Sequence, residues 1–299
     1  MRIVFCSEPF SPLQVDYAYE SELTAAQNVG FGFDMIDFEA LNDEENSAKS
    51  IRKVKEQNTP VTAIYRGWML KPEKYEQLFY ALATRNVNLI NSPEQYKHCH
   101  YLPESYSIIE KHTPKTISFK VNSDFDFDEV FQKLSVFGDK PLILKDFVKS
   151  RKHEWNEACY IPSASNRTEV ERVVNRFLEL QGEDLNEGLV FREFIEFQPL
   201  AAHSKSKMPL TKEFRLFFLD GKMLDSFEYW DEGDYSEMLP PKDIFADVAK
   251  KVESRFFTMD VAQSKDGNWY IVELGDGQVA GLPDNANISE IYRKLKENF

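Results

Sequence analysis

The chain has 299 residues, of which 42% are hydrophobic and 14% aromatic, as in folded globular proteins and unlike disordered ones. Its formal net charge of −14 repels nucleic-acid phosphates, and no apolar run approaches the roughly 20 residues of a membrane span, so neither nucleic acid nor membrane is an expected partner. Three widely spaced cysteines predict neither a disulfide framework nor a zinc site, and we expect a cytoplasmic protein.

The first hundred residues predict a small parallel α/β unit, because strand-like and helix-like patterns alternate. Strands are expected at 2–6, 33–38, 61–67 and 88–92, and helices at 20–30, 42–57 and 72–86. The charged segment 42–57 is expected to be a solvent-exposed helix. Arg66 ends the third strand, where it could meet a ligand at the sheet edge or simply close the core.

The pattern changes after residue 113. Strands are expected at 114–121, 141–147 and 188–197, helices at 128–138, 167–182 and 288–299, and hairpins at 213–230 and 256–278. The hairpins turn at Asp220-Gly221 and Asp266-Gly267. We place a linker near 101–113, which gives an N-terminal domain over 1–105 and a second domain over 106–299, with lobes 106–192 and 193–299.

Basic residues gather in LILKDFVKSRKHEW, residues 142–155. Lys145 comes at the end of a buried strand, where its ammonium group can reach a cleft while its stem packs on apolar neighbours. Lys149 and Lys152 follow on the next loop. Several ammonium groups at one point suit a polyphosphate, and a solvated basic loop is the alternative.

Carboxylates gather in the second hairpin. Asp260 and Glu273 each lie six residues from the Asp266-Gly267 turn, so they are expected to face the same side of the sheet. Facing carboxylates repel each other unless a cation lies between them, and Mg²⁺ prefers such oxygen ligands. The alternative is an exposed Asp260 and an Asp276 that merely caps a glycine-rich turn.

A third group comprises Glu193 in VFREFIEF and Glu213 with Arg215 in KEFRLFF. Strand alternation places Glu213 and Arg215 on one face, where they could simply pair across the sheet. A strand that ends beside an adenine offers backbone groups and an acid for the ribose hydroxyls, which is the other interpretation of this group.

The order of these groups resembles the ATP-grasp superfamily over about residues 113–299. The resemblance implies an α/β N-terminal domain followed by an α+β ATP-grasp fold, whose two lobes clamp ATP. It implies phosphate contacts for Lys145 and for Lys115 in PKTISF, with Lys149 and Lys152 nearby, and it puts Glu193 and the backbone of Phe194 at the adenine hinge.

KEFR is similar to the Asp-x-Arg element of tubulin tyrosine ligases and ribosomal-protein glutamate ligases. That similarity implies that Glu213 lies on the nucleotide side and that Arg215 contacts the phosphate or acyl-phosphate. MDV…YIVEL resembles the D…(I/V)E-x-N magnesium motif, which implies Asp260 and Glu273 as metal ligands. Gly275 replaces the motif's Asn, and Asp276, one place later, is carried over as a third ligand.

The resemblance implies an ATP- and Mg²⁺-dependent carboxylate–amine ligase that forms an acyl-phosphate. Its carboxylate and amine could be small molecules or groups on a protein. The basic loop and the EFR strand also resemble the cell-division-cycle-123 family, which implies the alternative of an ATP-binding assembly factor without a ligase reaction. Lys205 and Lys207 form a further basic pair that could serve an acidic substrate.

Overall fold

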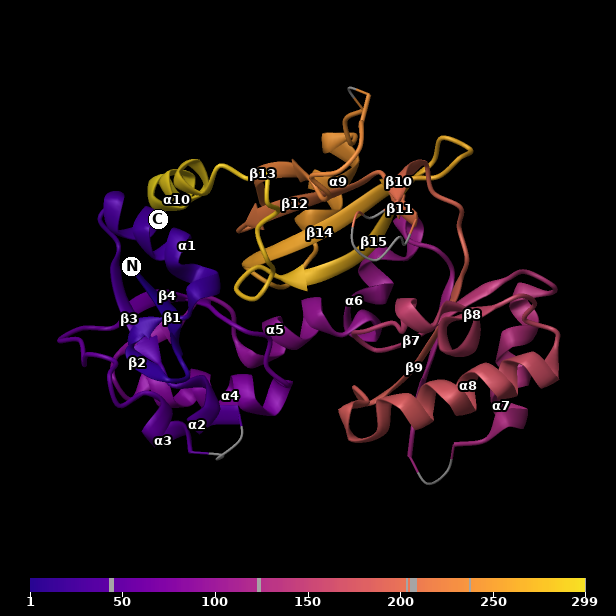
Figure 1. Cartoon of the computed structure of the whole chain (residues 1–299), viewed down its shortest axis with the longest axis horizontal. Coiled ribbons are helices and arrows are strands. Elements are labelled where there is room, and N and C mark those ends of the chain that lie inside the picture. Colours follow the sequence, from indigo (N-terminus) through magenta and orange to yellow (C-terminus); the bar gives the residue numbers. More distant parts are fainter. Residues whose placement is uncertain (43–45, 123–124, 203, 205–208, 237, 299) are drawn as a thin grey trace.

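Three β-sheets form the framework of the protein in the computed structural model, which describes residues 1–42, 46–122, 125–202, 204, 209–236 and 238–298. Figure 1 shows the N-terminal sheet on the left, the C-terminal sheet at the top and the sheet of β7 and β9 on the right, with α5 and α6 running between them. No described helix is both long and apolar enough to cross a membrane.

The N-terminal sheet has the strand order β3-β1-β4-β5 and is parallel, with β2 antiparallel to the end of β1. Its strands are β1 (Arg2–Glu8), β2 (Ser11–Val15), β3 (Gly32–Ile36), β4 (Val61–Arg66) and β5 (Val87–Leu89). The main helices are α1 (Glu20–Asn28) and α4 (Pro72–Ala83), as the hydrophobic pattern predicts. The predicted parallel α/β unit is therefore confirmed.

The predicted exposed helix at 42–57 is wrong. The structure has two short helices, α2 (Phe38–Asn42) and α3 (Ser47–Ser50), and residues 43–45 lie outside the described part of the chain. Ile51 and Val54 are buried in the N-terminal core, with exposed fractions of 4% and 1%. Burial of these two side chains holds the segment against the core, so it does not form one continuous solvent-exposed helix.

The second sheet is antiparallel, with the order β6-β9-β7-β8. Its strands are β6 (Thr116–Lys120), β7 (Leu142–Asp146), β8 (Tyr160–Ile161) and β9 (Gly188–Glu193). Helices α7 (Phe127–Leu134) and α8 (Arg167–Gln181) pack their apolar faces on this sheet. Strand β9 ends at Glu193, earlier than predicted, although the Phe194 N–H still donates to the Pro141 carbonyl at 2.9 Å.

The third sheet is antiparallel, with the order β13-β12-β14-β15. It is built from the two predicted hairpins, β12 (Glu213–Leu219) with β13 (Lys222–Glu228) and β14 (Phe256–Gln263) with β15 (Trp269–Asp276). Helix α9 (Lys242–Ala249) covers one face, and a small hairpin, β10 (Pro199–Ala202) with β11 (Pro209–Thr211), precedes the sheet. Asp220 and Gly221 both have positive φ, as the first turn requires.

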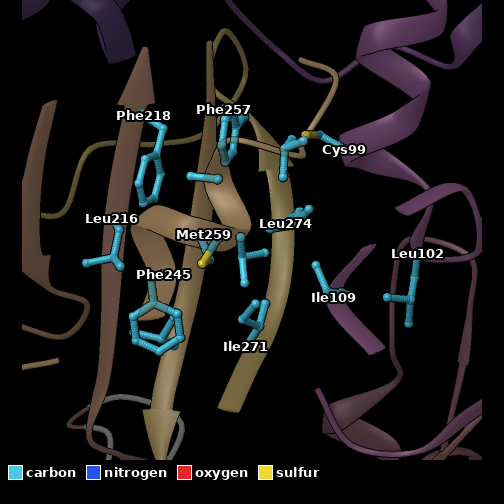
Figure 2. Packing of buried hydrophobic residues seen from close by; sticks show 14 of the residues in the cluster. Cys99, Leu102, Ile109, Leu216, Phe218, Phe245, Phe257, Met259, Ile271 and Leu274 are labelled. Atoms are coloured by element: carbon cyan, nitrogen blue, oxygen red, sulfur yellow. The ribbon is translucent and has the colours of Figure 1, made fainter. Parts of the chain in front are cut away.

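The segment predicted as a linker is largely helical and packed. Helix α5 (Pro93–His100) begins with a capping box formed by Ser92 and Gln95, and α6 (Leu102–Ile109) follows it directly. Figure 2 shows Cys99, Leu102 and Ile109 facing Ile271 and Leu274 of β15, in one hydrophobic cluster. These helices therefore form part of the core beside the third sheet.

The last helix, α10 (Ile288–Glu297), returns to the N-terminal sheet and packs beside α1. Ile3 of β1, Phe217 of β12 and Ile291 of α10 belong to one buried cluster. The first and third sheets therefore share a hydrophobic core, which fixes their relative position.

Candidate functional site

A cavity of about 440 Å³ opens where β7, the third sheet and the α5–α6 segment meet. It brings together seven of the residues predicted from the sequence: Lys145, Lys149, Lys152, Arg215, Asp260, Glu273 and Asp276. Four others, Lys115, Glu193, Phe194 and Glu213, are not among its lining residues. The cavity thus joins the basic loop to carboxylates more than a hundred residues away in sequence.

Asp260 and Glu273 are directly opposite each other on β14 and β15, as the turn spacing predicts. Arg215 on β12 is opposite Asp260 on its other side. Its Nε donates to Asp260 Oδ1 at 2.8 Å and its Nη2 donates to Oδ2 at 2.7 Å. Arg215 therefore forms a two-point ion pair with Asp260 on the neighbouring strand, which is a pairing across the sheet.

Lys145 and Glu273 form the second charged pair of the site, with 3.8 Å between Nζ and Oε2. Lys145 is buried, whereas the side chain of Glu273 is 46% exposed toward the cavity. Burial lowers the pKa of Lys145 despite the neighbouring Glu273 charge. Burial opposes ionisation of Glu273, but the positive charges of Lys145 and Lys152 outweigh it and lower the pKa of that carboxyl.

The basic loop is held in place by Asp146, a residue that the sequence analysis did not single out. Its Oδ1 accepts hydrogen bonds from the backbone N–H groups of Val148 at 2.7 Å and Lys149 at 2.5 Å. Its Oδ2 accepts from Gln181 at 2.9 Å and from Asn186 at 2.8 Å. A fully buried carboxylate thus fixes the start of the loop that presents the lysines.

Lys152, on the basic loop, lies near the carboxylates of Glu213 and Glu273. Burial would lower the pKa of Lys152, but the carboxylates of Glu213 and Glu273 raise it overall. Burial raises the pKa of Glu213, against the opposing effect of Lys152. Thr211 also donates to Glu213 at 2.5 Å. Glu213 therefore lies near the site through Lys152, although it does not line the cavity.

Lys115, predicted to contact phosphate, and Glu193 and Phe194, predicted for the adenine hinge, have other contacts in the structure. Lys115 Nζ donates to the Val136 carbonyl at 3.2 Å, and Glu193 accepts from Lys140 at 2.7 Å. Phe194 packs edge-on against the rings of Trp155 and Tyr160, which stack on each other at 5.3 Å. Their nucleotide roles remain predictions. Lys205 and Lys207 lie outside the described residues.

Asp276 lies three residues after Glu273, so strand alternation turns it to the opposite face. Its carboxylate accepts hydrogen bonds from Asn91 Nδ2 at 2.6 Å and from the Gln278 N–H at 2.9 Å, and it is fully buried. The described residues contain no cluster of three or more His, Cys, Asp or Glu side chains suited to a metal. A role for Asp276 as a third ligand remains a prediction that requires these hydrogen bonds to be given up.

The buried position of Asp276 predicts a pH-dependent stability. Burial raises its pKa to about 7, although the hydrogen bonds from Asn91 and Gln278 lower it. Because the folded protein holds this proton more tightly than the unfolded chain does, its free energy of unfolding should fall as the pH rises between about 4 and 7. The free energy of unfolding of Asp276→Asn should not fall in this way, so the difference in free energy of unfolding between the unmodified protein and this variant should become smaller as the pH rises from about 4 to 7. Urea unfolding at several pH values measures this difference, and a difference that stays constant would contradict the prediction.

Two further residues at or beside the site were not identified from the sequence. Arg192 of β9 is buried and donates to the Ile271 carbonyl of β15 at 2.8 Å, linking the second and third sheets, and burial lowers its pKa to about 10. Tyr229 places its ring 4.6 Å from the Arg215 guanidinium carbon. The position of Arg192 in the otherwise apolar strand segment GLVFRE could have indicated a buried charge with a specific role. No pattern in the sequence pointed to Tyr229.

The comparisons with known proteins agree with this architecture. A family model described as "ATP-grasp domain, R2K clade family 3" matches residues 136–295. No protein with a curated description matches the sequence. Among solved structures, D-cycloserine synthetase DcsG aligns with a TM-score of 0.60 at 13% identity, over 100% of this chain and 99% of that one.

Two other solved structures align over nearly their full lengths. The RimK domain ATP-grasp protein from Sphaerobacter thermophilus has a TM-score of 0.61 and 12% identity, with 99% of this chain and 98% of that chain covered. The ATP-grasp ligase PsnB, complexed with a minimal precursor, Mg and ADP, has a TM-score of 0.57 and 14% identity, with 98% and 96% covered. At these identities the similarity is one of fold, and it confirms the expected fold class.

Proposed function

The chain belongs to the ATP-grasp proteins of R2K clade family 3, and from that premise we propose that it is an ATP- and Mg²⁺-dependent carboxylate–amine ligase. One observation carries the proposal. A single cavity holds the buried Lys145, the Arg215–Asp260 pair and a half-exposed Glu273 that faces Asp260. Structures with the same fold include the ATP-grasp ligase PsnB and D-alanyl-alanine synthetase A from Vibrio cholerae, which supports this reaction class.

The donor set fits Mg²⁺. This ion is commonly held by one or two protein carboxylates together with phosphate and water oxygens. Asp260 and Glu273 would hold it from opposing strands, with Arg215 keeping the Asp260 carboxylate oriented. The ion would supply charge neutralisation to the nucleotide phosphates.

The remaining charges suit a phosphoryl transfer that needs mainly positioning and electrostatic stabilisation. In the proposed reaction, a carboxylate oxygen of the substrate forms a bond to the γ-phosphorus of ATP, and the bond to the β-phosphate oxygen breaks. Lys145 and Lys149 stabilise the phosphate oxygens, and Arg215 steadies the acyl-phosphate. An amine then forms the C–N bond, inorganic phosphate leaves, and the amine proton passes to solvent.

Lys145→Met is expected to weaken ATP binding by about tenfold, equivalent to about 1.4 kcal/mol, because one buried cationic contact to phosphate is removed. The methionine stem keeps most of the packing. Titration calorimetry with ATP in the presence of Mg²⁺ measures the change. Lys250→Met, which removes an exposed lysine paired with Asp247, is the matched control. Equal ATP affinities in Lys145→Met and Lys250→Met would show that Lys145 does not contribute to phosphate binding.

Hydroxylamine trapping tests the reaction itself. The full-length protein is incubated with Mg²⁺, ATP, hydroxylamine and a panel of carboxylates that includes the amino acids and peptides. The proposal expects ADP release only with a suitable carboxylate, and one hydroxamate for each ADP. ATP binding without hydroxamate, together with a co-purifying protein, would instead favour the assembly-factor alternative.

A further inference from the structure

On one wall of the cavity, two buried polar side chains have no hydrogen-bond partner in the described part of the chain. His100 ends α5 and is 9% exposed, and neither of its ring nitrogens has a partner among the described residues. Ser105, in α6, is 1% exposed, and its Oγ also has no partner among them. Both line the same cavity as the charged pairs. The mechanism described above uses neither residue.

A buried polar group without a hydrogen-bond partner is energetically costly, so native proteins contain few of them and each needs a physical explanation. His100 and Ser105 together carry three such atoms on the surface of one cavity. A ligand that forms hydrogen bonds with these three atoms would remove this cost when it is bound.

The position of the imidazole is fixed before any ligand arrives. His100 stacks on Tyr96 with ring centroids 5.0 Å apart and 11° between planes, and Tyr96 stacks on Tyr75 at 4.0 Å. The Tyr96 hydroxyl donates to the Leu70 carbonyl at 2.8 Å and accepts from the Leu70 N–H at 3.0 Å. Such a held ring presents its nitrogens in one orientation, as a binding residue requires.

The two parts of the cavity differ in charge. Lys145, Arg215, Asp260 and Glu273 make one part fully ionic, which suits the phosphates and the acyl-phosphate. Cys99, His100, Leu102 and Ser105 form a second part, here called the helical wall, which carries no formal charge when the imidazole is neutral. Burial lowers the pKa of His100 to about 4, because the opposing charge of Glu273 does not outweigh it and the charges of Lys149 and Lys145 add to it, so the ring is neutral at physiological pH. The helical wall therefore suits an uncharged group.

We propose that His100 and Ser105 bind the amine acceptor of the ligation in its uncharged form. The inference rests on the proposed ligase function and adds the site of the second substrate. An uncharged primary amine has two N–H donors and one lone pair. If the unprotonated ring nitrogen and the Ser105 hydroxyl each accept one N–H, the lone pair stays free to attack the acyl-phosphate. Positive charge on Lys145 and Lys149 disfavours the protonated amine, which cannot react.

The apolar neighbours of this pair indicate the kind of amine. Cys99 and Leu102 flank His100, and Met69 and Val279 also line the cavity. A group attached to the amine nitrogen would contact these side chains. The acceptor is therefore a primary amine with a compact apolar substituent rather than a second charged group.

Binding of simple probes to the full-length protein tests the inference without turnover. The protein is saturated with Mg²⁺ and a non-hydrolysable ATP analogue, and the His100 ring signal is followed by NMR, with His100→Phe used to assign it. Hydroxylamine, which is largely uncharged near neutral pH, should shift this signal in a saturable manner, and acetate should not. Ser105→Ala should weaken hydroxylamine binding by about fivefold, as expected for one lost hydrogen bond.

His98→Phe is the matched control. His98 lies on the same helix and is 5% exposed, and its Nε2 also has no partner within the described ranges, but it is not among the residues lining the cavity. This variant should bind hydroxylamine as the unmodified protein does. The inference is overturned if acetate shifts the His100 signal instead, if hydroxylamine leaves it unchanged, or if His98→Phe weakens hydroxylamine binding as much as Ser105→Ala does.

Turnover separates this inference from the proposed function. In the trapping assay, His100→Phe should raise the KM for hydroxylamine by about tenfold or more and leave the affinity for the ATP analogue unchanged. Failure of the unmodified protein to form any hydroxamate would contradict the ligase function, and the NMR titration would still show whether the helical wall binds an amine. Hydroxamate formation with an unchanged KM in His100→Phe would contradict the amine site alone.

Discussion

Glu273→Gln is expected to reduce ATP turnover by about 10²- to 10³-fold, while the fold remains intact. The substitution keeps size and shape but removes the negative charge that faces Asp260 and Lys145. A charged group that stabilises the transferring phosphate contributes about 3–4 kcal/mol to the transition state. The side chain is 46% exposed, so little folding stability depends on it. Steady-state ADP release measures the loss.

Glu196→Gln is the matched control for this substitution. Glu196 is an exposed glutamate that pairs with Lys265 at 2.8 Å, outside the lining of the cavity. It should turn over ATP as the unmodified protein does, and both variants should unfold at the same denaturant concentration. Normal turnover in Glu273→Gln would remove this residue from the metal site.

Arg66→Met is expected to destabilise the protein by about 3–5 kcal/mol, because it leaves the buried Glu22 carboxylate without its counter-charge. Arg66 is 3% exposed and donates to both oxygens of Glu22, at 2.7 and 2.8 Å. Its Nη1 also donates to the carbonyls of Gly277, Gln278 and Ala280. Urea unfolding gives the change in the free energy of unfolding.

Arg255→Met provides the comparison. Arg255 pairs with Asp220 at 2.7 Å, but both side chains are more than 40% exposed, and such surface pairs contribute at most about 1 kcal/mol. A loss in Arg66→Met no larger than that in Arg255→Met would show that Glu22 is not held by Arg66. The Arg66 variant should also bind ATP more weakly, since Ala280 and Gly281 line the cavity.

The elements whose residues are close in sequence could be predicted well. Asp220-Gly221 and Asp266-Gly267 mark the two turns. Asp260 lies opposite Glu273 as predicted, but only because the register shifts between Asp260 and Val261, which the sequence did not indicate. Lys145 could be located because its strand is a short apolar run that ends in charge. Local patterns of period two and turn signals therefore locate these elements.

Contacts between distant segments could not be predicted. The partner of Arg215 across the sheet is Asp260, which could not be named from the sequence because the pairing of β12 with β14 joins residues 45 positions apart. The charged segment 42–57 was misread because its few apolar residues, Ile51 and Val54, determine its position. Arg66, for which the sequence left two possibilities open, is buried and donates to Glu22 and to the Gly277 carbonyl, as expected for a residue that closes the core.

Asp276 and His100 illustrate two different limits. The three-residue interval between Glu273 and Asp276 implies that they lie on opposite faces of a regular strand. The resemblance to the family's magnesium motif nevertheless led to the prediction of Asp276 as a third ligand. His100 offered no signal, since its importance arises from the absence of described hydrogen-bond partners in a folded cavity wall. Hydrogen-bond satisfaction depends on tertiary structure.

The most direct test of the central claim is the fate of a carboxylate oxygen. The full-length protein is given Mg²⁺, ATP, hydroxylamine and the carboxylate that supports hydroxamate formation, labelled with oxygen-18 in its carboxyl group, and the released phosphate is analysed by mass spectrometry. A ligase that forms an acyl-phosphate transfers one labelled oxygen to each phosphate released. Phosphate that carries no label would contradict the proposed mechanism.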